Sequence, residues 1–140
     1  MICDTSKITM PDGETVPVID LFPGRSIISP RITAGIAWQM AIAPIKDRKV
    51  EIKNETHRLL LANGESLTAT ADQLVATRGT KRTQYRDVED IAIGDLLVGE
   101  RAGVRVSMEV VATQRSTDPV RCVSLDTGGQ AYVAEGVLCR

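Results

Sequence analysis

Histidine and cysteine are both rare in this chain. The only histidine is His57, and the three cysteines, Cys3, Cys122 and Cys139, show no Cys-x-x-Cys spacing. A structural zinc site needs about four clustered ligands, and a disulfide framework needs paired cysteines. We therefore expect no metal site, no cofactor and no disulfide framework, in a protein of a reducing compartment.

Aromatic residues, long apolar runs and an excess of one charge are lacking as well. Phe, Trp and Tyr together make up 3% of the chain, which leaves few rings for stacking against nucleobases. The formal net charge is −1, whereas nucleic-acid-binding domains are usually basic. No apolar run approaches the ~18 residues that span a bilayer, and no signal peptide is recognisable. We expect no nucleic-acid partner, no membrane partner and no secretion.

What the chain does contain is a series of short alternating segments. Lys49–Lys53 alternates polar and apolar side chains, as a half-buried strand does. Asn63-Gly64 predicts a two-residue hairpin. Further strands are expected at Thr15–Leu21, Ser26–Ser29, Ile32–Ile45, His57–Ala62, Glu65–Thr70, Asp95–Val98, Val104–Thr113, Val120–Leu125 and Ala131–Leu138. With a length of 140 residues, this pattern predicts one all-β domain over residues 1–140.

One internal repeat is visible. Val18–Ile27 aligns with Val88–Leu97: in both segments an acidic residue precedes an aliphatic one, and a glycine follows three residues later. The two glycines, Gly24 and Gly94, are half the chain apart. We interpret each copy as a strand, a tight turn in which glycine takes a positive φ, and a returning strand. The repeat predicts two related halves wrapped into one β structure.

Four segments resemble, in order, the sequence blocks of the Hint domain, the β-rich module shared by inteins and Hedgehog autoprocessing domains. They are Asp4–Gly24, Asn63–Val75, Val88–Leu97 and Val120–Arg140. The resemblance covers nearly the whole chain. It implies an all-β, horseshoe-like Hint-type fold with pseudo-twofold symmetry, which agrees with the repeat.

The resemblance also implies a chemistry, self-cleavage. In the family, a first-residue Cys or Ser attacks the preceding carbonyl, a Thr and a His of the second block assist, and a terminal Asn cyclises. The matching positions here hold Met1, Thr70, Gln73 and, in place of the penultimate histidine, Arg140. A thioether has no proton to lose and a carboxamide does not titrate. With no Asn after Arg140, we regard these four positions as vestigial and predict no catalytic residue.

Two functions fit these observations. The first is a catalytically silent module, not an enzyme, that has a structural or protein-binding role in a homo-oligomer or larger assembly. Because the family occurs in phage genomes, one form of it is a tail or capsid accessory protein, found in the cytoplasm or in the virion. The second is an autoprocessing element with inactivated or trimmed splice junctions. Gln73 argues against trimming because it lies in the middle of the chain.

Three further residues have specific expectations. A shift of register would make Cys3 a nucleophilic thiol, although such a thiol needs a base or a cation beside it. Cys122 and Cys139 fit the apolar alternation of closing strands, so both are expected in the core. His57 is expected to be solvated or at a strand edge. Thr70 with Asp72 either keeps a hydrogen-bonding role or is an ordinary turn.

Overall fold

The computed structural model describes residues 1–33, 37–80 and 82–140, and its regular structure is almost entirely extended. Two short 3-10 helices, η1 (Val18–Asp20) and η2 (Val88–Asp90), interrupt the strands. The strands are β1 (Ile2–Cys3), β2 (Lys7–Thr9), β3 (Thr15–Pro17), β4 (Ser26–Ile28), β5 (Arg31–Thr33), β6 (Ala37–Gln39), β7 (Ile42–Pro44), β8 (Asp47–Lys53), β9 (Thr56–Leu61), β10 (Ser66–Ala69), β11 (Leu74–Arg78), β12 (Thr83–Asp87), β13 (Leu96–Arg101), β14 (Val104–Ser116), β15 (Val120–Asp126), β16 (Tyr132–Ala134) and β17 (Val137–Cys139).

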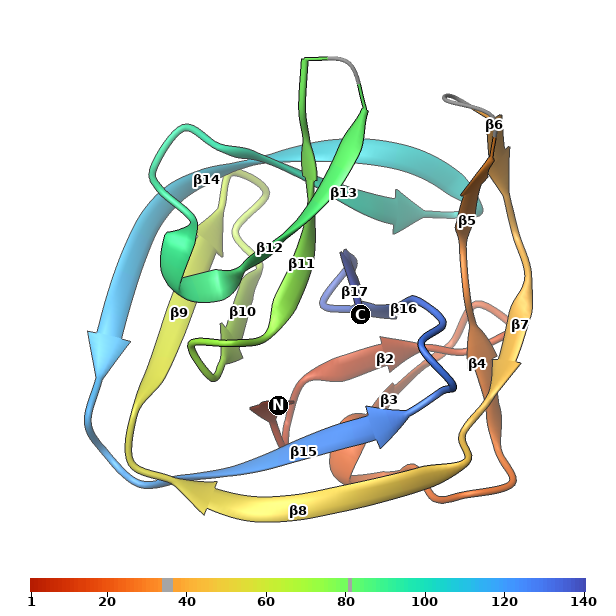
Figure 1. Cartoon of the computed structure of the whole chain (residues 1–140), viewed down its shortest axis with the longest axis horizontal. Coiled ribbons are helices and arrows are strands. Elements are labelled where there is room, and N and C mark those ends of the chain that lie inside the picture. Colours follow the sequence, from red (N-terminus) through yellow and green to blue (C-terminus); the bar gives the residue numbers. More distant parts are fainter. Residues whose placement is uncertain (34–36, 81) are drawn as a thin grey trace.

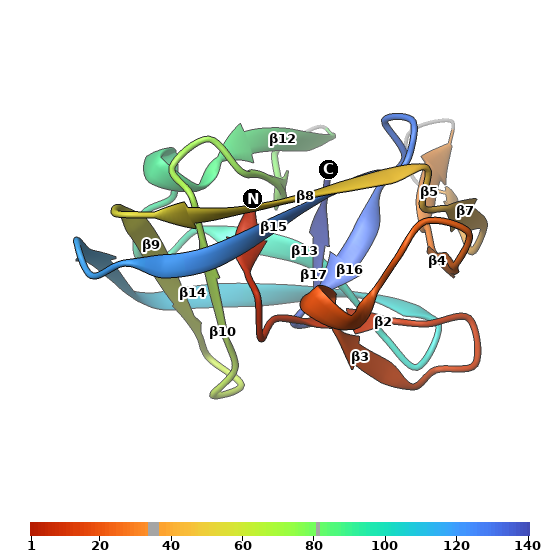
Figure 2. The same ribbon diagram turned by 90° about the horizontal axis from the view of Figure 1, so that it is seen from below.

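Most of these strands belong to one sheet that curves around the molecule (Figure 1). In the described residues this sheet has 13 strands in the order β3-β2-β16-β17-β11-β13-β14-β9-β10-β1-β15-β8, with β12 beside β11. The long strand β14 pairs with β13 in its first half and with β9 in its second, and a register shift between Val110 and Ala112 separates the two pairings. Figures 1 and 2 both place the two chain ends close together near the centre of the molecule.

The internal repeat is also a structural repeat. Each copy begins with a 3-10 helix, η1 or η2, and each helix is followed by a glycine of nearly the same conformation, Gly24 with φ +95° and Gly94 with φ +93°. Each glycine N–H donates to a backbone carbonyl oxygen in its own half: Gly24 to Ile45, just after β7, at 3.0 Å, and Gly94 to Val110 of β14 at 2.8 Å. The two halves therefore build this turn in the same way.

The first part of each copy was predicted to be a strand, but it is a 3-10 helix. The N–H groups of Val18 and Val88 donate to the carbonyl oxygens of Ser6 and Gln73, at 2.8 and 2.9 Å. The following residues then close a 3-10 turn instead of extending along a neighbouring strand. The strand expected at Thr15–Leu21 accordingly ends after three residues.

The hairpin predicted at Asn63-Gly64 is present, but its connection is longer by one residue. β9 and β10 are antiparallel neighbours, and the Leu61 N–H donates to the Glu65 carbonyl oxygen at 2.9 Å. Gly64 has φ +88°, whereas Asn63 does not have a positive φ. A two-residue type I′ turn needs positive φ at both central residues. The three-residue connection needs it only at the glycine.

Two other segments divide differently from the prediction. Ala131–Leu138 was expected as one strand and is the hairpin β16–β17, turned by Glu135 and Gly136 with φ +50° and +77°. The less regular segment Ile32–Ile45 is extended where it is described, in β5, β6 and β7; its residues 34–36 lie outside the described residues.

The core lies between the inward faces of the curved sheet. Cys122 and Cys139 are both 0% exposed, which confirms their predicted core packing. In the part of the chain that the structure describes, no helix has the length and apolar character needed to cross a membrane. The largest fully buried side chains are Ile2, Ile8, Val18, Leu21, Ile27, Ile45, Leu59, Leu61, Leu67, Val75, Leu97 and Leu138.

Candidate functional site

The turn between β10 and β11 holds both ends of the chain. This turn, Thr70–Gln73, is closed by a hydrogen bond from the Gln73 N–H to the Thr70 carbonyl oxygen at 3.1 Å. Both side chains are buried, with exposed fractions of 8% for Thr70 and 5% for Gln73. Their buried polar atoms need partners, and the two ends of the chain supply them. We call the turn Thr70–Gln73 the corner.

Thr70 contacts Met1 through backbone and side chain. Its N–H donates to the Met1 carbonyl oxygen at 2.9 Å. Its hydroxyl oxygen accepts from the Met1 nitrogen at 3.0 Å and lies 3.2 Å from the Met1 carbonyl oxygen. The position that the resemblance equates with the nucleophile is thus fixed against the corner, but it presents a thioether.

Asp72 completes the contacts of Thr70. The Thr70 hydroxyl donates to Asp72 Oδ1 at 2.8 Å, and this hydrogen bond is the main cause that lowers the pKa of Asp72; the Met1 amine and Lys53 act in the same direction. Burial lowers the pKa of the Met1 amine, although the Asp72 carboxylate opposes that shift. The pair Thr70–Asp72 therefore keeps the hydrogen-bonding role that the sequence left open.

Gln73 binds the other end of the chain. Its side-chain Nε2 donates to the carbonyl oxygens of Leu74 and Arg140, at 3.0 and 3.2 Å. Its Oε1 lies 3.5 Å from the Tyr132 hydroxyl, which donates to it. Burial raises the pKa of Tyr132, so this hydroxyl stays protonated. Both polar atoms of the Gln73 side chain are thus hydrogen-bonded, and they link the turn to Tyr132 of β16 and to Arg140.

The four predicted positions therefore come together, whereas Cys3 lies outside the corner. Met1 contacts Thr70, and Arg140 contacts Gln73; the Arg140 guanidinium also stacks on the Tyr85 ring, 4.6 Å from its centre. The Sγ of Cys3 faces its own neighbours, 3.6 Å from Asp4 Oδ1 and 3.4 Å from Thr5 Oγ1.

His57 was expected to be solvated or at a strand edge, but its strand has a neighbour on each side and its side chain is only 20% exposed. It sits within β9, opposite Ala69 on one side and Arg115 on the other. Its Nε2 is 3.6 Å from Glu55 Oε1. The imidazole is therefore a mid-sheet side chain beside a carboxylate, with no contact to Thr70 or Gln73.

The sequence reasoning missed Tyr132 and Lys53. Tyr132 was part of a predicted strand and carried no role, yet its hydroxyl orients Gln73. Lys53 ends β8 and lies near Asp72 and Cys122, both of which raise its pKa, after the larger effect of Glu51. One signal for Tyr132 was available, since a buried tyrosine usually finds a hydrogen-bond partner.

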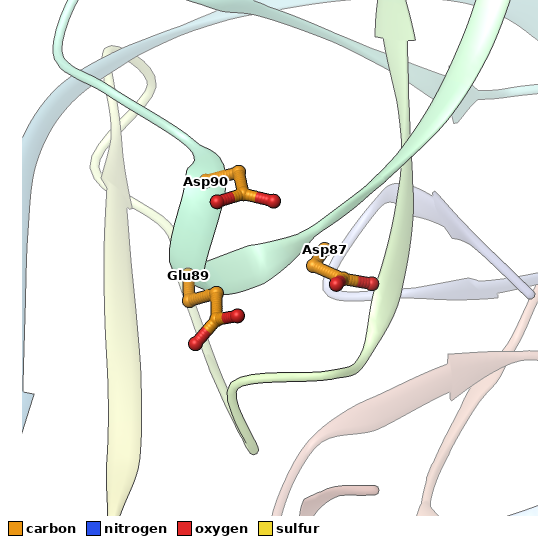
Figure 3. Close-up of side chains that lie close together, drawn as sticks. All are labelled: Asp87, Glu89 and Asp90. Atoms are coloured by element: carbon orange, nitrogen blue, oxygen red, sulfur yellow. The ribbon is translucent and has the colours of Figure 1, made fainter.

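A cluster of carboxylates lies elsewhere on the molecule. Asp87 directly precedes η2, and Glu89 and Asp90 lie in it (Figure 3). One carboxylate oxygen of each residue lies within 4.8 Å of the other two. Two of the three are exposed, and Arg86 donates to the backbone carbonyl of Asp90 at 2.7 Å. Exposed acidic groups are ordinary at the start of a helical turn, so we do not infer a metal site from this cluster.

Comparisons with known proteins identify the fold. No protein-family profile matches the sequence, and no curated protein is significantly similar to it. In structure the chain is similar to the TvoVMA intein (TM-score 0.83, 14% identity, 99% of this chain and 95% of that one). It is also similar to a bacterial intein-like domain from Clostridium thermocellum (0.82, 15%, 99% and 95%) and to a DnaB intein from Synechocystis sp. PCC 6803 (0.81, 16%, 99% and 96%). The predicted Hint-type, intein-like all-β fold is confirmed.

Proposed function

We propose that this chain is a catalytically silent intein-like module with a structural or protein-binding role. The observation that carries the proposal is the state of Gln73. This residue stands where the resemblance places a titrating histidine, and its amide donates to Leu74 and Arg140 while accepting from Tyr132. An amide cannot gain or lose a proton near neutral pH. Gln73 thus acts as a link between strands and not as a general acid or base.

Met1, which Thr70 binds at the beginning of the chain, supports the same proposal. The thioether of Met1 cannot be deprotonated to attack a carbonyl. The Thr70 hydroxyl is occupied by Met1 and Asp72. What remains of the site is a set of hydrogen bonds that stabilises the closed molecule.

A protein-binding role is supported by β8, the last strand in the sheet order. Of the described strands, β15 alone pairs with β8, so the outer edge of β8 has free backbone groups. Its side chains Val50 and Ile52 are 40% and 62% exposed. Free edges of this kind accept an extended segment of a partner. The tail or capsid version of the role remains a prediction of the resemblance alone.

A second candidate, autoprocessing, is favoured by one observation. Thr70 contacts Met1 through both its N–H and its hydroxyl, which would place a donor beside a bond preceding Met1. If residues other than Met1, Thr70, Gln73 and Arg140 supplied the missing nucleophile and acid, the chain would cleave itself.

A tripartite fusion tests both candidates. The chain is placed between two reporter proteins, purified, and incubated with and without dithiothreitol, and the products are resolved on a denaturing gel. If the module is silent, the fusion stays intact. Thiol-dependent cleavage of the peptide bond before Met1 would establish autoprocessing. The matched control carries Met1→Cys, Gln73→His and Arg140→His with an asparagine after it. Cleavage of this control alone would assign the silence of the native chain to these positions.

A further inference from the structure

Two of the three cysteines lie directly opposite each other on neighbouring strands. β1 and β15 are antiparallel, and their register pairs Ile2 with Val123 and Cys3 with Cys122. Residues paired in this way have their side chains on the same face of the sheet. The third cysteine, Cys139, instead lies opposite Tyr132 and Val75.

The hydrogen bonds of this ladder show which kind of pair the cysteines form. The Asp4 N–H donates to the Arg121 carbonyl oxygen at 3.0 Å, and Arg121 Nε donates to Asp4 Oδ2 at 2.8 Å. Hydrogen-bonded and non-hydrogen-bonded pairs alternate along an antiparallel ladder. The adjacent pair Cys3–Cys122 is therefore non-hydrogen-bonded.

In such a pair the Cα atoms are about 4.5 Å apart, and disulfides span Cα separations of roughly 4.4 to 6.8 Å. Both cysteines are free thiols in the structure. A pair of this type has a backbone separation at which a disulfide can form, and the side chain of Cys3, whose Sγ contacts Thr5, has to rotate toward its partner.

We propose that Cys3 and Cys122 form a reversible disulfide, a redox modification site that is independent of the proposed silence of the corner. A low-molecular-weight disulfide such as glutathione disulfide is the oxidant. Cys3, which is half-buried, loses its proton to solvent and attacks one glutathione sulfur, so that a mixed disulfide forms and one glutathione thiolate leaves. Cys122 then loses its proton and attacks the Cys3 sulfur, which releases the second glutathione. Two protein thiols are oxidised by two electrons, and one glutathione disulfide is reduced to two glutathiones.

The surroundings of the two thiols fit this order of events. Cys122 is buried and its pKa is raised, mainly by burial, while the Met1 amine and Lys53 counteract the shift. It is therefore poorly suited to meet an external oxidant, but its residue is paired with Cys3 in the sheet, so it can attack the Cys3 sulfur, once that has rotated toward it, without solvent access. Cys3 is the accessible partner, and it forms the first bond.

The disulfide would anchor β1, the short strand that follows Met1. β1 consists of two residues, Ile2 and Cys3, and it continues directly from Met1. A covalent bond from Cys3 to Cys122 of β15 would help to hold Met1 against Thr70. It would also close a loop that contains most of the chain. Closing so long a loop restricts the unfolded chain strongly, so oxidation is expected to raise the thermal stability.

The test uses the full chain under native conditions. It is incubated with glutathione disulfide, quenched by alkylation, digested and mapped by mass spectrometry. A peptide linking Cys3 to Cys122, lighter by two hydrogens and reversed by dithiothreitol, is the expected product. The midpoint of thermal unfolding should rise by roughly 5 to 10 °C on oxidation.

Matched variants separate this pair from a general oxidation. Cys139→Ala should form the same link as the native chain, whereas Cys122→Ala should accumulate a glutathione adduct on Cys3 and Cys3→Ala should stay unmodified. The proposal is overturned if native protein stops at the Cys3 adduct or links only after denaturation. Mapping of the native chain decides this even if a variant fails to fold.

Discussion

Gln73 donates a hydrogen bond from its side-chain amide to the carbonyl oxygen of Arg140, 67 residues further along the chain, at 3.2 Å. Three residues before it, Thr70 holds Met1. One short turn therefore fixes both ends of the polypeptide. In the intein-like fold this is the place where the resemblance puts the chemistry, and here hydrogen bonds link Met1 and Arg140 to this one turn.

Replacing Gln73 by alanine should destabilise the protein. The change leaves a cavity and removes the partner of the buried Tyr132 hydroxyl and of the Arg140 carbonyl oxygen. We expect a loss of about 2 to 4 kcal/mol in the free energy of unfolding, measured by urea denaturation. The matched change Gln84→Ala, at an exposed glutamine of β12, should alter it by less than about 0.5 kcal/mol. Equal effects of the two changes would contradict the role of Gln73 as a link.

Replacing Thr70 by valine should raise the pKa of Asp72 toward its ordinary value of 3.8, because the hydroxyl of Thr70 is the main cause of its depression. A carboxyl with a lowered pKa contributes stability above its unfolded value and loses it as the pH falls through the folded value. The valine variant should therefore lose less stability in acid. Carboxyl titration by NMR measures the shift, and Thr70→Ser, which keeps the hydroxyl, should leave the pKa unchanged.

The protein should lose stability in alkaline solution through Cys139. Burial raises the pKa of this thiol from 9.0 to about 12. A raised pKa contributes stability that is complete below pH 9 and is lost as the pH rises toward 12. The slope is at most about 1.4 kcal/mol per pH unit for one group. Urea denaturation between about pH 8 and pH 11 should show a shallower fall for Cys139→Ala, and an identical slope would exclude this thiol as a source. Tyr132 titrates in the same direction in both proteins.

Gly99 is a position where a side chain has no room. β13 and β17 approach so closely there that a Cβ on Gly99 would collide with the Gly136 carbonyl oxygen and the Met108 methyl group. Because the first of these atoms is backbone, it cannot move aside cheaply. Gly99→Ala should cost about 3 kcal/mol or more, whereas Ser107→Ala, exposed on the neighbouring β14, should be nearly neutral. Thermal and urea unfolding of both variants provide the comparison.

The sequence predicted those features that local pattern determines. Alternation located most of the strands, although it missed β1, β2, β11 and β12. The glycine spacing located the repeated turn of Gly24 and Gly94, and the Asn63-Gly64 pair located a hairpin. The resemblance placed Met1, Thr70, Gln73 and Arg140 at equivalent positions, and the structure brings them together.

The rest depended on contacts between segments that are distant in sequence. Val18 and Val88 at the start of the 3-10 helices find carbonyl partners in Ser6 and Gln73, just before β2 and β11, and no periodicity within ten residues reports such a partner. The role of Tyr132 depends on Gln73 lying beside it. The Cys3–Cys122 pair depends on which strands become neighbours, and the sequence offered two cysteines far apart with no shared motif.

Because one turn grips both Met1 and Arg140, a host polypeptide joined to these residues would enter and leave at nearly the same point. A unit of this kind can be grafted into an exposed loop without forcing the flanks of that loop apart, which is the usual obstacle to domain insertion. Such a host protein would need little change in its own structure, because the corner already holds Met1 and Arg140 near one turn.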